Sequence, residues 1–131
     1  SSSLAHVQSS DDSASGTRAS FEEITGIEDE GGPTDTMLEQ QSNNGVYETV
    51  KGNEQAIGYV GLGYVGSGVK SVSIGGVACS ESTVKAGDYP IGRALWMITD
   101  GEADGLAKKF IDFVKSAEGQ AIVKEKGFIT I

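Results

Sequence analysis

The stretch SGTRASFEE, residues 15–23, carries the signal from which the fold can be read. Serine and threonine at its start are favoured helix N-caps, and two glutamates follow where negative charge suits an early helical turn. Phe21 and Ile24 lie three residues apart and therefore share one face of a helix. The stretch predicts a helix from about Thr17 to Thr25.

The first residues of this stretch also supply the parts of an oxyanion site. Free backbone N–H groups at a helix N-terminus, together with the helix dipole, favour an anion there. Gly16 allows a ligand to approach the backbone closely. The hydroxyls of Ser15 and Thr17 add neutral donors, and Arg18 adds a charged, forked donor. The alternative interpretation is an ordinary N-cap followed by a solvated arginine.

Extended and helical patterns alternate along the rest of the chain, which indicates an α/β fold. Residues 4–7 suggest a short edge strand or a frayed end. Residues 46–51 are ambiguous, although the spacing of two valines favours a helix. The expected strands are 56–60, 72–74 and, strongest of all, 94–99. The expected helices are 34–41, 80–85, an amphipathic helix whose apolar stripe runs from Leu106 to Ala117, and a last helix from about Glu118.

The composition is that of a globular chain with one domain and a core, since 37% of its 131 residues are hydrophobic. Its 19 glycines predict many tight turns. The net charge of -9 argues against nucleic acid as a partner, because an acidic surface repels phosphate backbones. No long apolar run indicates a membrane span. The N-terminal residues show no signal-peptide pattern, which a mature or truncated chain would also lack.

A formal GxGxxG pattern spans Gly61 to Gly66, after a predicted strand. Dinucleotide binding requires a helix to open at those glycines. Residues 67–76 instead alternate as a strand does, so the pattern fits glycines at a crossing between two lobes better than a cofactor site.

The other chemically active side chains do not form a convincing set. His6 is the single histidine and lies in a polar segment, and Cys79 is the single cysteine, so neither a metal site nor a disulfide is indicated. The acids at 28–30 suit a solvated loop, with a cation site as the alternative. No nucleophile, base and acid assemble, so neither catalytic residues nor cofactors are expected.

Four stretches together resemble the phosphate-binding protein of the phosphate ABC transporter, a periplasmic substrate-binding protein family, in its C-terminal portion. The most specific is the string SAEGQ, residues 116–120, between two amphipathic helices. The match extends over about residues 9–131. The four stretches are 15–23, which resembles the oxyanion-binding helix start, 56–61, 88–99, which resembles a return strand, and 110–128, which resembles the closing helices.

The resemblance implies a partial, type II periplasmic-binding-protein-like fold, with a mixed sheet flanked by helices. Residues 1–60 would be part of the second lobe, 61–76 the interlobe crossing and a short strand, and 77–131 the C-terminal part of the first lobe. The family binds inorganic phosphate without catalysis and delivers it to a membrane permease. Carried over by motif, Ser15, Gly16 and Thr17 would hydrogen-bond phosphate, and Arg18 would reach the ligand or stabilise the closed form.

Two departures from the family pattern matter. The family usually has an arginine four or five residues before the motif serine, where this chain has Asp11 and Ser10. Family members are also much longer, so the chain is expected to be a fragment. Its expected partners, besides phosphate and the permease, are the missing N-terminal lobe or a second copy of the chain. The expected location is extracytoplasmic, with a lipid anchor possible in a full-length protein.

Three alternative functions remain open at the level of sequence. The protein would be a carrier of another oxyanion, such as sulfate, molybdate or tungstate, or a hydrolase of phosphate esters. It would otherwise be a surface protein without a ligand, whose acidic face keeps it in solution.

Overall fold

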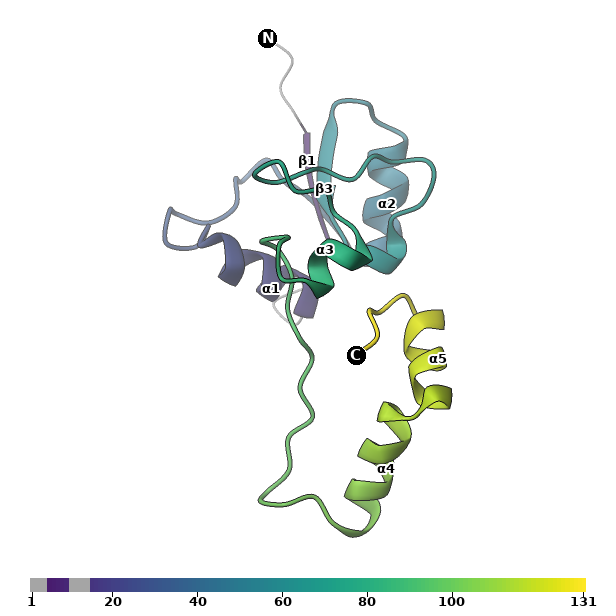
Figure 1. Ribbon diagram of the computed structural model, residues 1–131. Helices are drawn as coiled ribbons and strands as arrows, with labels where there is room; N and C mark the ends of the chain where they lie inside the picture. Colours follow the sequence, from purple (N-terminus) through teal and green to yellow (C-terminus); the bar gives the residue numbers. More distant parts are fainter. Residues whose placement is uncertain (1–4, 10–14) are drawn as a thin grey trace. The chain divides into compact units, whose positions relative to one another are not determined.

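The computed structural model describes residues 5–9 by their backbone alone and residues 15–131 with their side chains (Figure 1). Contacts within the chain divide it into two compact units, Ser1–Gly92 and Arg93–Ile131. The predicted lobe boundaries stay a prediction, because lobes are defined in the longer family members.

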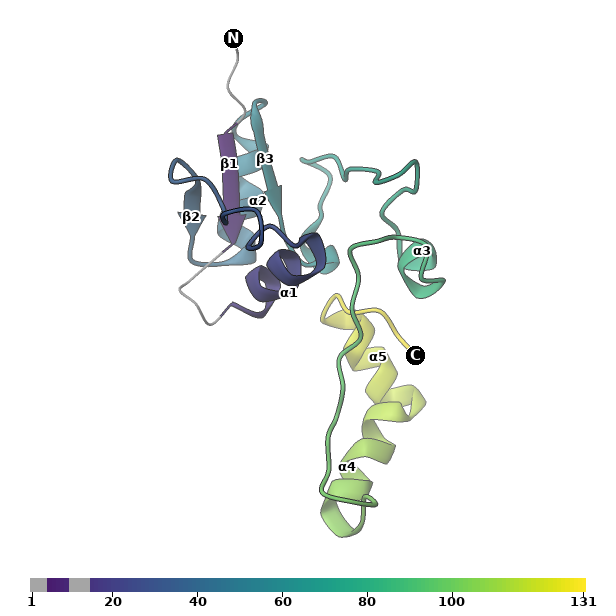
Figure 2. The ribbon, with the colours of Figure 1, turned by 90° about the vertical axis from the view of Figure 1, so that its left-hand side faces the viewer.

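The first unit is built on a three-stranded parallel sheet (Figure 2). Its strands are β1 (Ala5–Ser9), β2 (Leu38–Gln40) and β3 (Ala56–Tyr59), in the order β2-β1-β3. Val7 is level with Leu38 on one side and with Gly58 on the other. A strand therefore forms in this part of the chain, but the prediction that it lies at the edge of the sheet is wrong, because β2 and β3 pair with β1 on either side.

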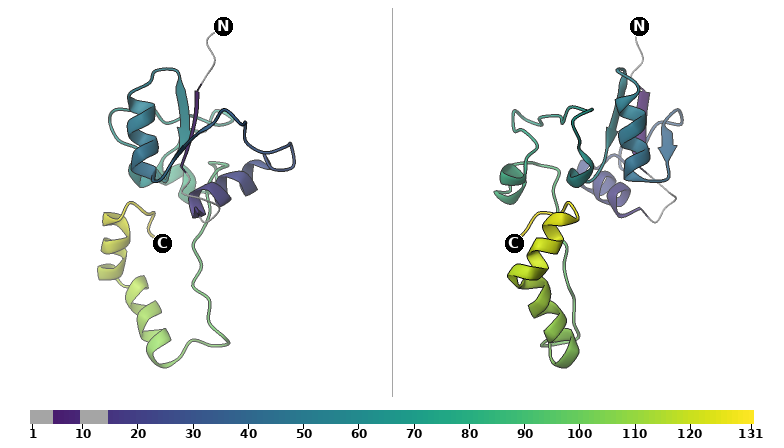
Figure 3. Two further views of the ribbon diagram at one scale, coloured as in Figure 1. Left: turned by 180° about the vertical axis from the view of Figure 1, so that it is seen from behind. Right: turned by 90° about the vertical axis from the view of Figure 1, so that its right-hand side faces the viewer.

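Two helices connect these strands on opposite faces of the sheet (Figures 1 and 3). Helix α1 (Gly16–Thr25) leads from β1 to β2, and α2 (Asn43–Lys51) leads from β2 across β1 to β3. The two crossovers run in opposite directions along the sheet, and right-handed connections then place the helices on opposite faces. The carboxyl end of β1 is consequently the point at which the connections diverge.

The core of the first unit is small, and it confirms three predicted elements. Val46 on α2 is 1% exposed, which resolves the ambiguity at residues 46–51 in favour of a helix. On the other face, the ring of Phe21 from α1 stacks on Tyr59 of β3, with centroids 4.0 Å apart and planes at 9°. The predicted helix at 17–25 and strand at 56–60 thus meet through these two aromatic rings.

The predicted helix at 34–41 is wrong. The segment turns at residues 35–36 and then enters β2, whose backbone pairs with β1. A three-residue strand shows no periodicity of its own, so its pairing partner rather than its sequence decides its conformation.

The predicted strand at 72–74 is also wrong. A single bridge joins Ile74 to Val77 across Gly75 and Gly76, whose φ angles are 60° and 82°. Positive φ at two consecutive glycines makes a tight hairpin turn, but in the described residues only the pair next to this turn is bridged, so no strand extends from it. The predicted helix at 80–85 is confirmed as α3 (Glu81–Lys85), which begins with a capping box between Ser80 and Thr83.

The second unit contains two helices that share one capping residue. Helix α4 (Gly105–Lys115) ends and α5 (Ala117–Glu125) begins at Ser116, whose hydroxyl accepts a hydrogen bond from the Gly119 N–H at 3.2 Å. Both helices were predicted. Among the residues that the structure describes, no helix is long and apolar enough to cross a membrane.

The strongest predicted strand, residues 94–99, does not form. The segment is extended, but no strand lies beside it in the described part of the chain. Trp96 and Ile98 are 83% and 91% exposed. β-forming residues set a preference, but a strand needs a second strand to take up its N–H and C=O groups. The apolar stripe of α4 is likewise uncovered, with Leu106 83% and Phe110 62% exposed.

Candidate anion-binding site

The start of α1 lies at the carboxyl edge of the parallel sheet, after the central strand β1. In open α/β sheets this edge, at the point where connections diverge, is where ligands bind. Ser15 is the N-cap, and its hydroxyl accepts a hydrogen bond from the Arg18 N–H at 3.2 Å. The sequence therefore placed the helix start correctly.

Two adjacent backbone donors open α1. No acceptor within residues 5–9 or 15–131 takes the N–H groups of Gly16 and Thr17, whereas the Ala19 N–H donates to the Ser15 carbonyl at 3.0 Å. A Cβ added at the exposed Gly16 would meet no described atom within 4 Å. The helix start thus presents two N–H groups and an open approach, which suits an anion.

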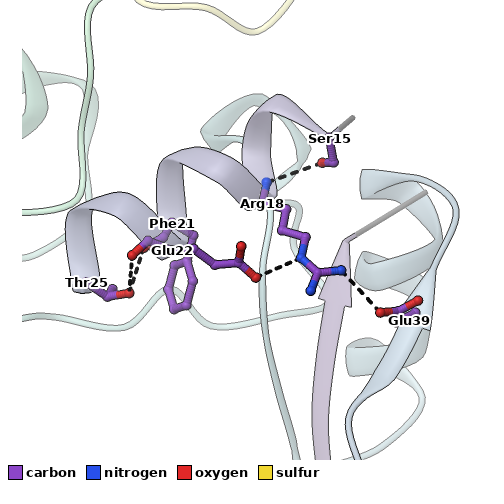
Figure 4. A network of polar contacts seen from close by, with 6 residues as sticks. All are labelled: Ser15, Arg18, Phe21, Glu22, Thr25 and Glu39. Carbon is purple, nitrogen blue, oxygen red and sulfur yellow. Dashed lines mark hydrogen bonds and ion pairs between the residues drawn. The ribbon is translucent and has the colours of Figure 1, made fainter. Parts of the chain in front are cut away.

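Arg18 lies between two glutamates (Figure 4). Its Nε donates to Glu22 Oε1 at 2.7 Å, and its Nη1 donates to Glu39 Oε1 on β2 at 3.2 Å. The side chains of Arg18 and Glu22 are only 23% and 11% exposed. The hydrogen bond to Glu22, with the charges of Glu22 and Glu39, raises the pKa of Arg18 although burial opposes the shift. Arg18 is therefore bound by two carboxylates, and it is not the solvated arginine of the alternative interpretation.

Tyr59 borders this cluster from β3. Its hydroxyl is buried and has no hydrogen-bond partner in the described part of the chain. Burial, and then the negative charge of Glu22, raises the pKa of Tyr59, while Arg18 lowers it. Tyr59 and Glu39 could not be predicted as neighbours of the helix start, because neither has a local spacing that relates it to residues 15–18.

Replacing Tyr59 by phenylalanine is expected to stabilise the protein by about 1 kcal/mol, because it removes a buried hydroxyl that lacks a partner and keeps the ring on Phe21. The free energy of unfolding from a denaturant titration measures this gain. Tyr64→Phe is the matched control, since Tyr64 is 49% exposed and should change little. A loss of stability in Tyr59→Phe alone would mean that the hydroxyl makes a bond in solution.

The same variant has a pH signature. A raised pKa means that the folded state holds the Tyr59 proton more tightly than the unfolded state, whose tyrosine titrates near 10.0. The resulting stabilisation is present below pH 10.0 and is lost as the pH rises toward the folded-state pKa. Tyr59→Phe should lack this part of the alkaline decline.

The other sequence candidates do not join the helix start. The glycines at 61–66 open a short 3-10 turn rather than an α-helix. A Cβ at Gly66 would lie 2.9 Å from the Tyr47 hydroxyl, so this glycine packs against a side chain of α2. Cys79 is half-buried. Asp11 and Ser10 lie outside the described residues, and so does the side chain of His6.

Acidic side chains at the end of α1 and in the turn after it, among them Glu23, Glu28 and Asp29, line a hollow of about 470 Å³. Among the described residues, no three metal-ligating side chains come together. The negative charge of this hollow makes it a poor place for an anion.

Comparisons with known proteins agree with this geometry. A family model described as a PBP superfamily domain matches residues 3–118. The phosphate-binding protein PstS 2 of Streptococcus pneumoniae is 38% identical over 124 residues, which make up 90% of this chain and 43% of that protein.

Two solved structures are similar to this chain over nearly its whole length. A phosphate-binding protein of a phosphate ABC transporter from Streptococcus pneumoniae gives a TM-score of 0.83 at 36% identity, over 96% of this chain and 51% of that one. A substrate-binding protein assigned to a phosphate ABC transporter of Clostridium perfringens, with phosphate bound, gives 0.75 at 30% identity, over 98% and 52%. The chain spans about half the length of the relatives it matches.

Proposed function

The chain belongs to the PBP superfamily, and from that premise we propose that it is part of an extracytoplasmic protein that binds inorganic phosphate and delivers it to the permease of an ABC transporter. The fold class predicted from the sequence, a partial type II periplasmic-binding-protein-like fold, is confirmed. The proposed protein performs no chemistry on its ligand.

One observation carries the proposal. The N–H groups of Gly16 and Thr17 have no acceptor in the described residues, and they open a helix at the edge of the sheet where ligands bind. Phosphate oxygens accept hydrogen bonds from such groups, and the helix dipole adds to the attraction. In the proposed site, Ser15 and Thr17 contribute hydroxyls and Arg18 contributes the positive charge.

The proposed site is one half of a clamp. In this proposal, residues 1–60 would be part of the second lobe, 61–76 the interlobe crossing and 77–131 the C-terminal part of the first lobe. The remaining ligand contacts would come from an N-terminal lobe or from a second copy of this chain. Because half of the contacts are then absent, the chain alone should bind phosphate more weakly than a complete two-lobed protein.

Calorimetric titration tests the proposal directly. The chain is titrated with phosphate in a phosphate-free buffer, and then with sulfate, molybdate and tungstate under the same conditions. Phosphate is expected to bind most tightly. If sulfate bound more tightly than phosphate, the protein would be a carrier of another oxyanion. If the chain hydrolysed a phosphate ester and Thr17→Ala abolished that turnover, the protein would be a hydrolase and not a carrier.

Arg18→Ala is expected to weaken phosphate binding about tenfold or more, because a charge-assisted contact contributes about 1.5–3 kcal/mol. The loss also leaves Glu22 without its 2.7 Å partner, so circular dichroism must first show that the variant is folded. Arg93→Ala is the matched control, since Arg93 is exposed in the other unit. An equal loss in both variants would point to the net charge of the chain rather than to the site.

A further inference from the structure

The guanidinium of Arg18 is held toward the sheet by carboxylates. In Figure 4 the side chain runs from α1 toward β2, while Ser15 marks the helix start. Glu22 lies one turn further along α1, and its carboxylate accepts a hydrogen bond from Nε of Arg18. An anion at Gly16 and Thr17 therefore meets an arginine that carboxylates already engage.

The charges of this group do not favour an anion. Arg18 contributes one positive charge, whereas Glu22 and Glu39 contribute one negative charge each. The summed charge of these three side chains is negative, and they lie next to the helix start at which phosphate is proposed to bind. Removing one carboxylate would make the group neutral and leave more of the guanidinium charge for a ligand.

The two glutamates are held differently. Glu22 is nearly buried, and its hydrogen bond to Arg18 is short, at 2.7 Å. Glu39 is 54% exposed, and its bond is longer, at 3.2 Å. An exposed ion pair contributes little stability, because water screens it. Glu39 is thus the partner that Arg18 can exchange for a ligand without exposing a buried charge.

We propose that Glu39 sets the affinity of the anion site, because its carboxylate and the phosphate compete for Arg18. The inference rests on the proposed phosphate site at the start of α1. Glu39, on β2, would lower the affinity for phosphate, so removing its carboxylate should tighten phosphate binding. A residue with a purely structural role would do the opposite, since its loss would loosen the helix start and weaken binding.

The test is a calorimetric phosphate titration of Glu39→Gln and Glu39→Ser. The first variant keeps the shape of the side chain, and the second is too short to reach Arg18. Both are expected to bind phosphate about threefold to tenfold more tightly than the parent chain, the effect of one unit charge near a protein surface. Glu48→Gln is the matched control, because Glu48 is an equally exposed glutamate, 57% against 54%, whose partner is Lys51.

A double variant shows whether Glu39 acts through Arg18. In an Arg18→Ala background, Glu39→Gln should produce a much smaller gain, because the contested guanidinium is gone. An equal gain in both backgrounds would overturn the competition, and so would unchanged or weaker binding in both Glu39 variants while the parent binds phosphate. If neither the parent nor any variant binds phosphate, the proposed function fails, and the inference fails with it.

Discussion

Phosphate binding should fall by about a hundredfold when Gly16 is replaced by valine. The proposed ligand approaches the N–H groups of Gly16 and Thr17, and a branched side chain at position 16 would occupy that approach. Losing two hydrogen bonds to a charged group costs about 3 kcal/mol, which corresponds to about a hundredfold in affinity. The substitution is not expected to disturb the fold, because a Cβ at Gly16 meets no described atom within 4 Å.

The control for this variant is Ala19→Val, which places the same side chain on the exposed face of α1 one turn further along. Because valine is a poorer helix former than alanine but not than glycine, a loss of affinity caused by helix propensity would appear in Ala19→Val and not in Gly16→Val. Calorimetry with phosphate separates them, and circular dichroism checks that both are folded. Full affinity in Gly16→Val would remove this glycine from the site.

Replacing Gly119 by alanine should destabilise the pair of helices α4 and α5 by about 3 kcal/mol. Gly119 is buried where the two helices join at Ser116. An added Cβ would collide with the Phe113 carbonyl oxygen and lie 2.7 Å from that of Val114. These are backbone atoms, which no rotamer change can move aside, so the junction itself must open.

Hydrogen exchange of the α5 amides measures this effect in the intact chain. Their protection should fall sharply in Gly119→Ala, whereas Lys124→Ala, an exposed substitution on the same helix, should leave it nearly unchanged. Equal protection in Gly119→Ala and the parent chain would mean that the junction adapts to a side chain at this position.

The parts of the fold that the sequence predicted are those decided locally. The helix at 17–25 shows its cap and its apolar spacing within nine residues, and the helices from 105 onward show an apolar stripe. Strand β2 was missed because it is three residues long and is created by pairing with β1. The segment 94–99 has every local sign of a strand and forms none, because pairing requires a partner that the described residues do not offer.

The candidate site divides in the same way. Ser15, Gly16 and Thr17 could be found from a short motif at a helix start, which is a local signal. The bond from Arg18 to Glu22 is also local, since residues four apart on a helix are neighbours. Glu39 lies 21 residues from Arg18, so only the folded sheet brings them together. The composition and spacing of the sequence contain no information about such a contact.

The extended segment at 94–99 has a consequence for handling this protein. Six consecutive residues without charge or proline, among them Trp96 and the branched Leu95 and Ile98, are largely exposed and match the signature of segments that stack into cross-β fibrils. Arg93 and Asp100 flank it as charged gatekeepers, which oppose that stacking but leave the segment itself intact. Aggregation of this chain should therefore begin at residues 94–99 and grow with protein concentration and with salt, which screens the repulsion between chains of net charge -9.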